Sequence, residues 1–164
     1  MIKGFISCIL IGEQFSPRKL EESSKLELYK KNERGELGTT GRYKNKKLPY
    51  GSAELNFRSK YKDLDISEEL DLVLEALSKN YSQIRKAGAS DIFLTATLGY
   101  INQCNWELNN KQLKKLANLG LSLGISCYED IDLLKEPIEY ADPEGNRYKA
   151  YLDEEGCETH ELVG

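Results

Sequence analysis

Cysteine and histidine are the residues that most often carry chemistry, and this chain has few of them. Of four cysteines and one histidine, only Cys157 and His160 lie close together in the sequence. A thiolate nucleophile needs an adjacent base and an orienting group, and the acidic neighbours Glu155 and Glu158 disfavour the thiolate form. A zinc site needs about four soft ligands at regular spacing. We therefore expect reduced structural thiols, no cysteine nucleophile and no metal site.

Acidic residues form several close pairs, from which a glycosidase or a divalent-cation site can be built. The pair Glu68/Glu69 falls where a helix is expected to begin, so helix capping explains it. The remaining pairs lie in polar stretches, where solvated surface is the simpler interpretation: Asp63/Asp65, Asp130/Asp132 and Asp153/Glu154/Glu155. The sequence has no Walker-type loop, dinucleotide fingerprint or GxSxG elbow. We predict that the chain is not an enzyme and uses no cofactor.

The segment 30–47 is rich in Lys and Arg residues and has tyrosines in it or close to it. Cations hold phosphates and rings stack on bases, so this mixture suits a nucleic-acid surface. The chain as a whole carries a net charge of −4, and a solvated loop is the more common explanation. Direct nucleic-acid binding is therefore kept as a minor alternative. The residues concerned are Lys30, Lys31, Arg34, Arg42, Lys44, Lys46 and Lys47, with Tyr29, Tyr43 and Tyr50 nearby.

Charge is unevenly distributed along the chain. Residues 1–60 hold 13 Lys and Arg against 7 Asp and Glu, a net charge of +6, whereas residues 129–164 hold 3 against 12, a net charge of −9. A polarised chain can steer a partner of opposite charge towards one face. Equally, the two ends can neutralise each other within the fold.

The hydrophobic pattern predicts the elements that must position these residues. The first strand is apolar on both faces, which is typical of a central strand. Ser67 and Asn109 are the expected N-caps, and Cys8 and Cys127 fall within apolar strand runs as small hydrophobic side chains. Residues 101–108 extend the preceding strand or turn back as a hairpin. Strands are predicted at 2–11, 26–31, 52–59, 91–100 and 121–127, and helices at 16–25, 67–88 and 109–120.

This order of elements predicts an α+β fold. We expect a mixed, mainly antiparallel sheet with helices packed on one face, in a ferredoxin-like, partly duplicated βαβ plan. Residues 1–129 form one domain, and residues 130–164 an acidic appendix packed on it, with a hairpin around the turn Pro143–Asn146. No apolar run approaches the roughly 20 residues needed to span a bilayer, and nothing near Met1 looks like a signal peptide. A cytoplasmic location is therefore expected.

The segment 109–128 (NNKQLKKLANLGLSLGISCY), after the predicted helix at 67–88, resembles the close of the bacterial domain-of-unknown-function family 4279. The opening strand, Gly12 and the Ser16-Pro17 helix start are similar to that family's opening, so the resemblance covers about residues 2–128. It implies a small bacterial protein without assigned chemistry. Some members accompany polymorphic or contact-dependent toxins as candidate immunity proteins. No functional residue carries over.

Charge distribution and resemblance together favour an immunity protein. Such a protein would bind the C-terminal domain of a cognate bacterial toxin, for which a nuclease is expected, and block it sterically and electrostatically. An unassigned intracellular binding or regulatory domain is the alternative, beside nucleic-acid binding through residues 30–47. The candidate contacts are Asp130, Asp132, Glu136, Glu139, Tyr140 and Asp142, with Tyr148 and Tyr151 as aromatic anchors.

Overall fold

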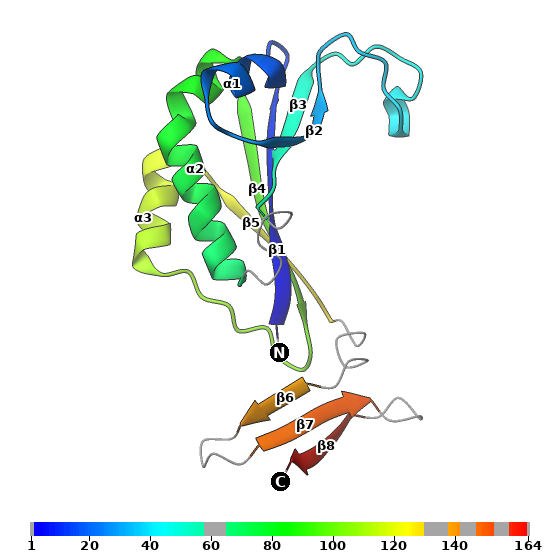
Figure 1. The fold of residues 1–164 in the computed structure, drawn as a ribbon, viewed down its shortest axis with the longest axis vertical. Helices are drawn as coiled ribbons and strands as arrows, with labels where there is room; N and C mark the ends of the chain where they lie inside the picture. The colour runs from blue at the N-terminus through cyan, green and yellow to red at the C-terminus, as the bar shows by residue number, and fades with distance from the viewer. Residues whose placement is uncertain (1, 58–64, 130–137, 142–146, 153–157, 164) are drawn as a thin grey trace. The chain divides into compact units, whose positions relative to one another are not determined.

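The structure, a computed structural model, describes residues 2–57, 65–129, 138–141, 147–152 and 158–163. Their helices and strands are drawn in Figure 1. In chain order they are β1 (Ile2–Gly12), α1 (Pro17–Ser23), β2 (Leu28–Asn32), the 3-10 turn η1 (Gly41–Tyr43), β3 (Gly51–Leu55), α2 (Ile66–Lys86), β4 (Asp91–Tyr100), α3 (Asn110–Leu119), β5 (Leu123–Glu129), β6 (Ile138–Ala141), β7 (Arg147–Leu152) and β8 (Glu158–Val163).

The chain divides into two compact units. One comprises Gly4–Thr97 and Glu107–Ser126, and the other comprises Met1–Lys3, Leu98–Trp106 and Cys127–Gly164. The described strands form a five-stranded sheet and a separate three-stranded sheet.

The five-stranded sheet has the order β2-β3-β1-β4-β5. Its first four strands follow the ferredoxin-like order, in which α1 and α2 each join two strands that have a third strand between them. β3 runs antiparallel to β1, with Cys8 opposite Leu55, and also antiparallel to β2. α3 then leads to β5, which extends the sheet beside β4. The predicted α+β fold, with a mainly antiparallel sheet and helices on one face, is confirmed.

The three helices lie on the same side of this sheet (Figure 1). Alternate residues of the central strand β1 point towards them: Ile6, Cys8 and Leu10 are buried. Burial, and then the nearby Glu54 carboxylate, raises the pKa of the Cys8 thiol to about 12, so Cys8 packs as the neutral, small hydrophobic side chain that was predicted. The helix α2 contributes its apolar stripe to the same core: Leu70, Val73, Leu74, Leu77 and Ile84.

The N-terminus of α2 differs from the prediction. The N-cap is Asp65, whose carboxylate accepts from the Ser67 amide at 2.7 Å, while Glu68 accepts from the Asp65 amide at 3.4 Å and completes a capping box. The prediction of Ser67 as the cap was therefore wrong, because an aspartate two residues earlier competes for the same amides.

Glu69 was also misassigned, since it does not serve as a solvated capping residue. Its side chain is only 1% exposed, and its Oε2 accepts from the Ile6 amide at 2.9 Å. The registered pairing of β3 with β1 begins at Cys8, opposite Leu55, so Ile6 lies before it. The carboxylate thus satisfies a strand amide that would otherwise be buried at a cost of about 1–3 kcal/mol.

Helix α3 is fixed to α2 at two points. Asn109 caps it as predicted, and the fully buried Gln112 both completes that capping box and donates from Nε2 to the Ser67 carbonyl at 3.1 Å. Further along, Lys115 donates to Glu75 at 2.8 Å, and Lys79 lies 3.1 Å from the same carboxylate. These contacts hold α3 against α2.

Glu75 should contribute to the acid sensitivity of the fold. Hydrogen bonds from Lys115 and Lys79 lower its pKa from 4.5 to about 2. Because the folded-state pKa lies below the unfolded value, this stabilisation is complete above pH 4.5 and is lost as the pH falls towards 2. We expect Glu75→Gln to flatten the fall in Tm over that interval, by the small, salt-sensitive amount of a surface ion pair.

The measurement is a series of thermal melts between pH 5 and pH 2 at low ionic strength. Glu22→Gln, a change at an exposed position of α1, is the control and should keep the wild-type slope. An unchanged slope in Glu75→Gln would contradict the role assigned to this pair.

Two further predictions need correction. Residues 101–109 form neither a strand nor a hairpin; after a turn at Asn102, whose φ is +62°, they connect β4 to α3 without regular structure. β5 begins at Leu123 and leaves Ile125 and Cys127 exposed, although both were expected to be buried. β5 is an edge strand of this sheet, and every residue of it after Leu123 is exposed.

The three-stranded sheet has the order β6-β7-β8 and is antiparallel throughout. The pairing of Ala141 with Arg147 confirms the predicted hairpin. The predicted turn lies outside the described residues. β8, which pairs with β7 from Glu158 to Val163, was not predicted, because its alternation of polar and apolar residues is weak. The expectation that this appendix packs on the first domain stays a prediction.

Candidate partner-binding surface

A hollow of about 520 Å³ lies where β1 ends and β4 begins. We call it the β1–β4 hollow. It is shallow, and the segments that line it come from three places in the sequence: the end of β1 and the turn after it, the residue before β3, and the turn between α2 and β4. The lining residues are Ile11, Gly12, Glu13, Gln14, Tyr50, Gly88, Ser90, Asp91 and Phe93.

The floor of this hollow is backbone packed on backbone. A Cβ atom on Gly12 would lie 2.3 Å from the Gly88 carbonyl oxygen, and one on Gly88 would lie 2.2 Å from the Gln14 carbonyl oxygen. Gly88 also has a φ of +97°, in the left-handed region that glycine alone adopts readily. Ser90 donates from its amide to the Ile11 carbonyl at 3.0 Å. The two turns are therefore locked together, and the side chains around them are held on a rigid base.

The rim of the hollow carries two carboxylates and two aromatic rings. Glu13 and Asp91 are both exposed; Asp91 accepts from the Ser90 hydroxyl at 2.7 Å, which orients it. Phe93 is 57% exposed and Tyr50 is partly buried. Carboxylates together with ring faces form the environment that a lysine or arginine side chain prefers. The hollow is thus suited to receive a cationic side chain from a partner.

Next to the hollow, the helix-free face of the sheet exposes apolar side chains. Phe5 and Ile9 of β1 are 44% and 39% exposed, on the face opposite to the buried Ile6 and Cys8. Phe93 of the neighbouring strand β4 is on this face too, since the adjacent Leu94 is buried towards the helices. We call Phe5, Ile9 and Phe93 the open-face patch. A cluster of this kind, beside polar groups, is typical of a protein-binding surface.

The predicted acidic contacts can be placed only in part. Asp130, Asp132, Glu136 and Asp142 lie outside the described residues. Glu139 lies in β6, opposite Lys149 of β7. These positions therefore stay predictions.

The three predicted tyrosines lie in the three-stranded sheet. Tyr140 of β6 is directly opposite Tyr148 of β7, so the sheet brings these two positions together on one face. Tyr151 is opposite Thr159 of β8 and is three residues from Tyr148. Since successive residues of a strand alternate between faces, Tyr151 belongs to the other face. As partner contacts, these three positions stay predictions.

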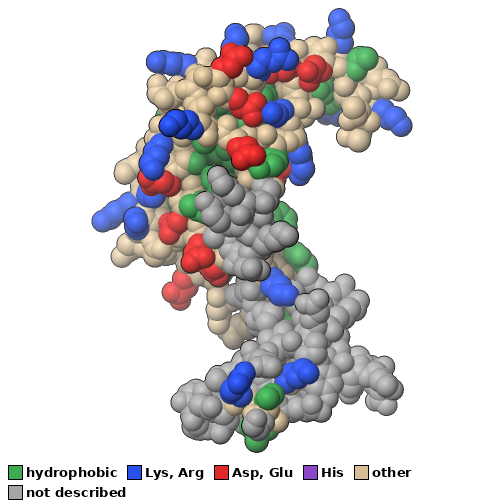
Figure 2. All heavy atoms as spheres, in the orientation of Figure 1, with side chains coloured by type: hydrophobic (Ala, Val, Ile, Leu, Met, Phe, Trp, Pro, Cys, Tyr) green, Lys and Arg blue, Asp and Glu red, His purple; other side chains and the backbone are tan. Residues whose placement is uncertain are grey.

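The cation-rich segment 33–50 is an ordered hairpin that extends beyond β2 and β3 (Figure 1). Backbone hydrogen bonds pair its two arms, from the Gly35 amide to the Leu48 carbonyl at 2.8 Å and from the Gly38 amide to the Lys46 carbonyl at 2.9 Å. We call it the basic hairpin. Figure 2 shows Lys and Arg side chains standing out from this part of the molecule.

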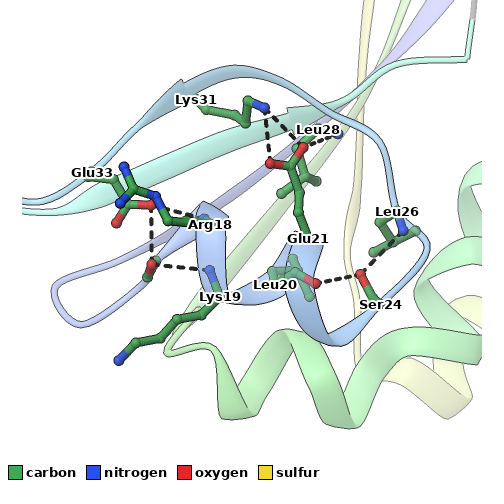
Figure 3. A network of polar contacts seen from close by, with 10 residues as sticks. Arg18, Lys19, Leu20, Glu21, Ser24, Leu26, Leu28, Lys31 and Glu33 are labelled. Carbon is green, nitrogen blue, oxygen red and sulfur yellow. Dashed lines mark hydrogen bonds and ion pairs between the residues drawn. The ribbon is translucent and has the colours of Figure 1, made fainter.

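Several of the predicted cations are engaged within the chain. Lys30 lies 2.7 Å from Glu54, and Lys31 donates to both oxygens of Glu21 at 3.0 Å (Figure 3). Arg34 donates to the Glu13 carbonyl at 3.3 Å. These contacts anchor β2 and the base of the hairpin to the rest of the unit.

At the outer end, Arg42 stacks on the Tyr43 ring at 4.7 Å, and Tyr43 meets Tyr50 edge to face. The exposed Lys44, Lys46 and Lys47 make no ion pair with any residue that the structure describes. The rings thus contact each other and an arginine, whereas these three ammonium groups face solvent.

Within the described ranges, no group of three or more His, Cys, Asp or Glu side chains is arranged to hold a metal ion. Nor does that part of the chain contain a helix with the length and apolar character to cross a bilayer. No protein-family model, curated protein or solved structure matches this chain. The interpretation of the surface therefore depends on its own geometry.

Sequence reasoning missed the β1–β4 hollow. Glu13 and Asp91 are isolated acidic residues almost 80 positions apart, so no local pattern pairs them. The available signal was glycine: Gly12 follows the strand predicted at 2–11, Gly88 ends the helix predicted at 67–88, and two such glycines are compatible with a close approach of their turns.

Proposed function

We propose that this chain is an immunity protein of the bacterial cytoplasm, which binds the C-terminal domain of a cognate contact-dependent or polymorphic toxin and neutralises it. The observation that carries the proposal is the β1–β4 hollow with its neighbouring open-face patch, where carboxylates, rings and exposed apolar side chains occur together. The resemblance to family 4279, whose membership we propose as well, and the net charge of −9 over residues 129–164 support the same choice of partner.

The partner that this surface fits is a basic protein domain. A lysine or arginine of the toxin enters the hollow between Glu13 and Asp91 and contacts Phe93, while apolar toxin side chains cover Phe5 and Ile9. Such burial supplies affinity, and the acidic charge speeds encounter and selects the partner. A toxin nuclease has the required cations, because its cleft must hold phosphates. Inhibition follows from occupying or flanking that cleft.

The proposal predicts that the gene immediately upstream encodes a large secreted protein, and the test is co-expression of the full chain with the C-terminal domain of that protein. We expect the two chains to co-purify in a fixed ratio and the cells to survive expression of the toxin domain. Cell death in the presence of well-expressed, folded chain, without co-purification, would exclude the proposed function.

A second candidate function, nucleic-acid binding, is favoured by one observation: the exposed side chains of Lys44, Lys46 and Lys47 on the basic hairpin. If these residues bind phosphates, the full chain should be retained on a polyanion resin and be released by salt. Replacing all three with glutamine should then abolish retention. The proposed immunity function predicts instead that the wild-type chain, with its net charge of −4, passes through the resin at 0.15 M salt.

A further inference from the structure

Two cysteines that are far apart in the sequence meet in the fold. The Sγ atoms of Cys104 and Cys127 are 3.5 Å apart, although the residues are separated by 23 positions. Cys104 lies in the connection from β4 to α3 and is partly buried, whereas Cys127 lies in β5 and is exposed. Both belong to the same compact unit of the chain. The prediction of four dispersed, inert thiols does not describe this pair.

We propose that Cys104 and Cys127 form a redox-modification site, at which hydrogen peroxide or a related hydroperoxide converts the dithiol to a disulfide. The exposed Cys127 sulfur attacks one peroxide oxygen, the O–O bond breaks, water leaves and a sulfenic acid forms. The Cys104 sulfur then attacks the Cys127 sulfur, the S–O bond breaks and a second water leaves. Two thiols are oxidised by two electrons, and the peroxide is reduced to two molecules of water.

The geometry gives the two sulfur atoms different roles in this two-step reaction. Cys127 is the one that solvent reaches, so it meets the oxidant. Burial, and then the hydrogen bond with Cys127, raises the pKa of the Cys104 thiol above its usual value, which disfavours Cys104 as the sulfur that attacks the peroxide. Only a small approach of the sulfurs is then needed, since they are already in contact.

The disulfide would join the β4–α3 connection to the last strand of the five-stranded sheet. Residues 101–109 have no regular structure of their own, and Asn102 turns the chain with a positive φ. A Cys104–Cys127 disulfide closes a loop in the unfolded chain and so lowers the conformational entropy of the unfolded state. We therefore expect Tm to rise by about 5–10 °C. Oxidation therefore stiffens the segment that leads from β4 to α3.

The experiment oxidises the purified full chain with a small excess of hydrogen peroxide, followed by intact-mass analysis, peptide mapping and thermal melting. We expect the loss of two hydrogen masses, a linked peptide that contains Cys104 and Cys127, and the higher Tm. Thiol reductant should reverse all three. Cys157→Ser is the matched control and should behave as the wild type does.

Serine variants of Cys104 and Cys127 distinguish the two steps of the reaction. In Cys104→Ser the reaction should stop at the Cys127 sulfenic acid, which a dimedone probe captures, and Tm should not rise. In Cys127→Ser neither the sulfenic acid nor the cross-link should form. Stable sulfinic acid on wild-type Cys127 without a linked peptide, or a cross-link that disappears in Cys157→Ser, would overturn the proposal.

Discussion

Reversing the two carboxylates of the β1–β4 hollow, with Glu13→Lys and Asp91→Lys together, should weaken binding of the toxin domain about 100-fold or more. Both side chains are exposed on the rim of the hollow, and neither makes an ion pair with a residue that the structure describes, so we expect the double variant to fold. In the proposed complex they would face a buried cation, and placing like charges there costs about 2–4 kcal/mol, which corresponds to a 30- to 1,000-fold change in affinity.

The matched control is the double variant Glu22→Lys with Glu107→Lys, which changes the net charge by the same amount at exposed positions away from the hollow. It should alter the association rate and its salt dependence but leave the dissociation rate close to wild type. Surface plasmon resonance at two salt concentrations separates the two cases. Equal losses of affinity in both variants would show that net charge alone governs binding and that the hollow is not the contact site.

Gly88→Ala should have the largest effect on stability, about 3 kcal/mol. Its φ of +97° disfavours any side chain, and the new Cβ atom would lie 2.2 Å from the Gln14 carbonyl oxygen, which is backbone and cannot move aside cheaply. Gly35→Ala is the matched control, because Gly35 has a φ of +88° and nothing within 4 Å of its Cβ position. That change should cost only about 1 kcal/mol of backbone strain.

Urea unfolding of both variants provides the comparison. The turns at Gly12 and Gly88 also form the floor of the hollow. The folded molecules of Gly88→Ala should therefore bind the toxin domain more weakly than Gly35→Ala does. If the two alanine variants were equally stable, the close backbone approach between the turns after β1 and α2 would be wrong.

The helices and most strands of the larger sheet could be predicted because their signals are local. The 3.6-residue stripe of α2 and the alternation in β4 each fix an element and its buried face within one stretch of sequence. Asn109 capped α3 as expected for the same reason. The ferredoxin-like arrangement of the first four strands could be predicted from the succession of βαβ units, which limits how strands can be arranged.

The features that were missed depend on residues distant in sequence. Glu69 resembles any acidic residue in the first turn of a helix, yet it completes the hydrogen bonding of β1, 63 positions earlier. Cys104 and Cys127 form a pair only because β5 returns beside the connection after β4. The β1–β4 hollow likewise needs the turns at Gly12 and Gly88 to touch. None of these contacts leaves a periodic trace in the sequence.

The predicted contacts at residues 130–142 were chosen by charge density alone. The hollow has two carboxylates, but it adds rings and a rigid floor, which charge counting does not detect. The two surfaces make different predictions about where a partner binds, and they can be distinguished directly.

Amide hydrogen exchange of the full chain, with and without a saturating amount of the cognate toxin domain, is the most direct test. Binding at the hollow and the open-face patch should slow exchange at residues 5–14 and 88–95, with little change in α3. Absence of any protection at a toxin concentration that saturates co-purification, or protection confined to the basic hairpin, would contradict the surface proposed for the partner.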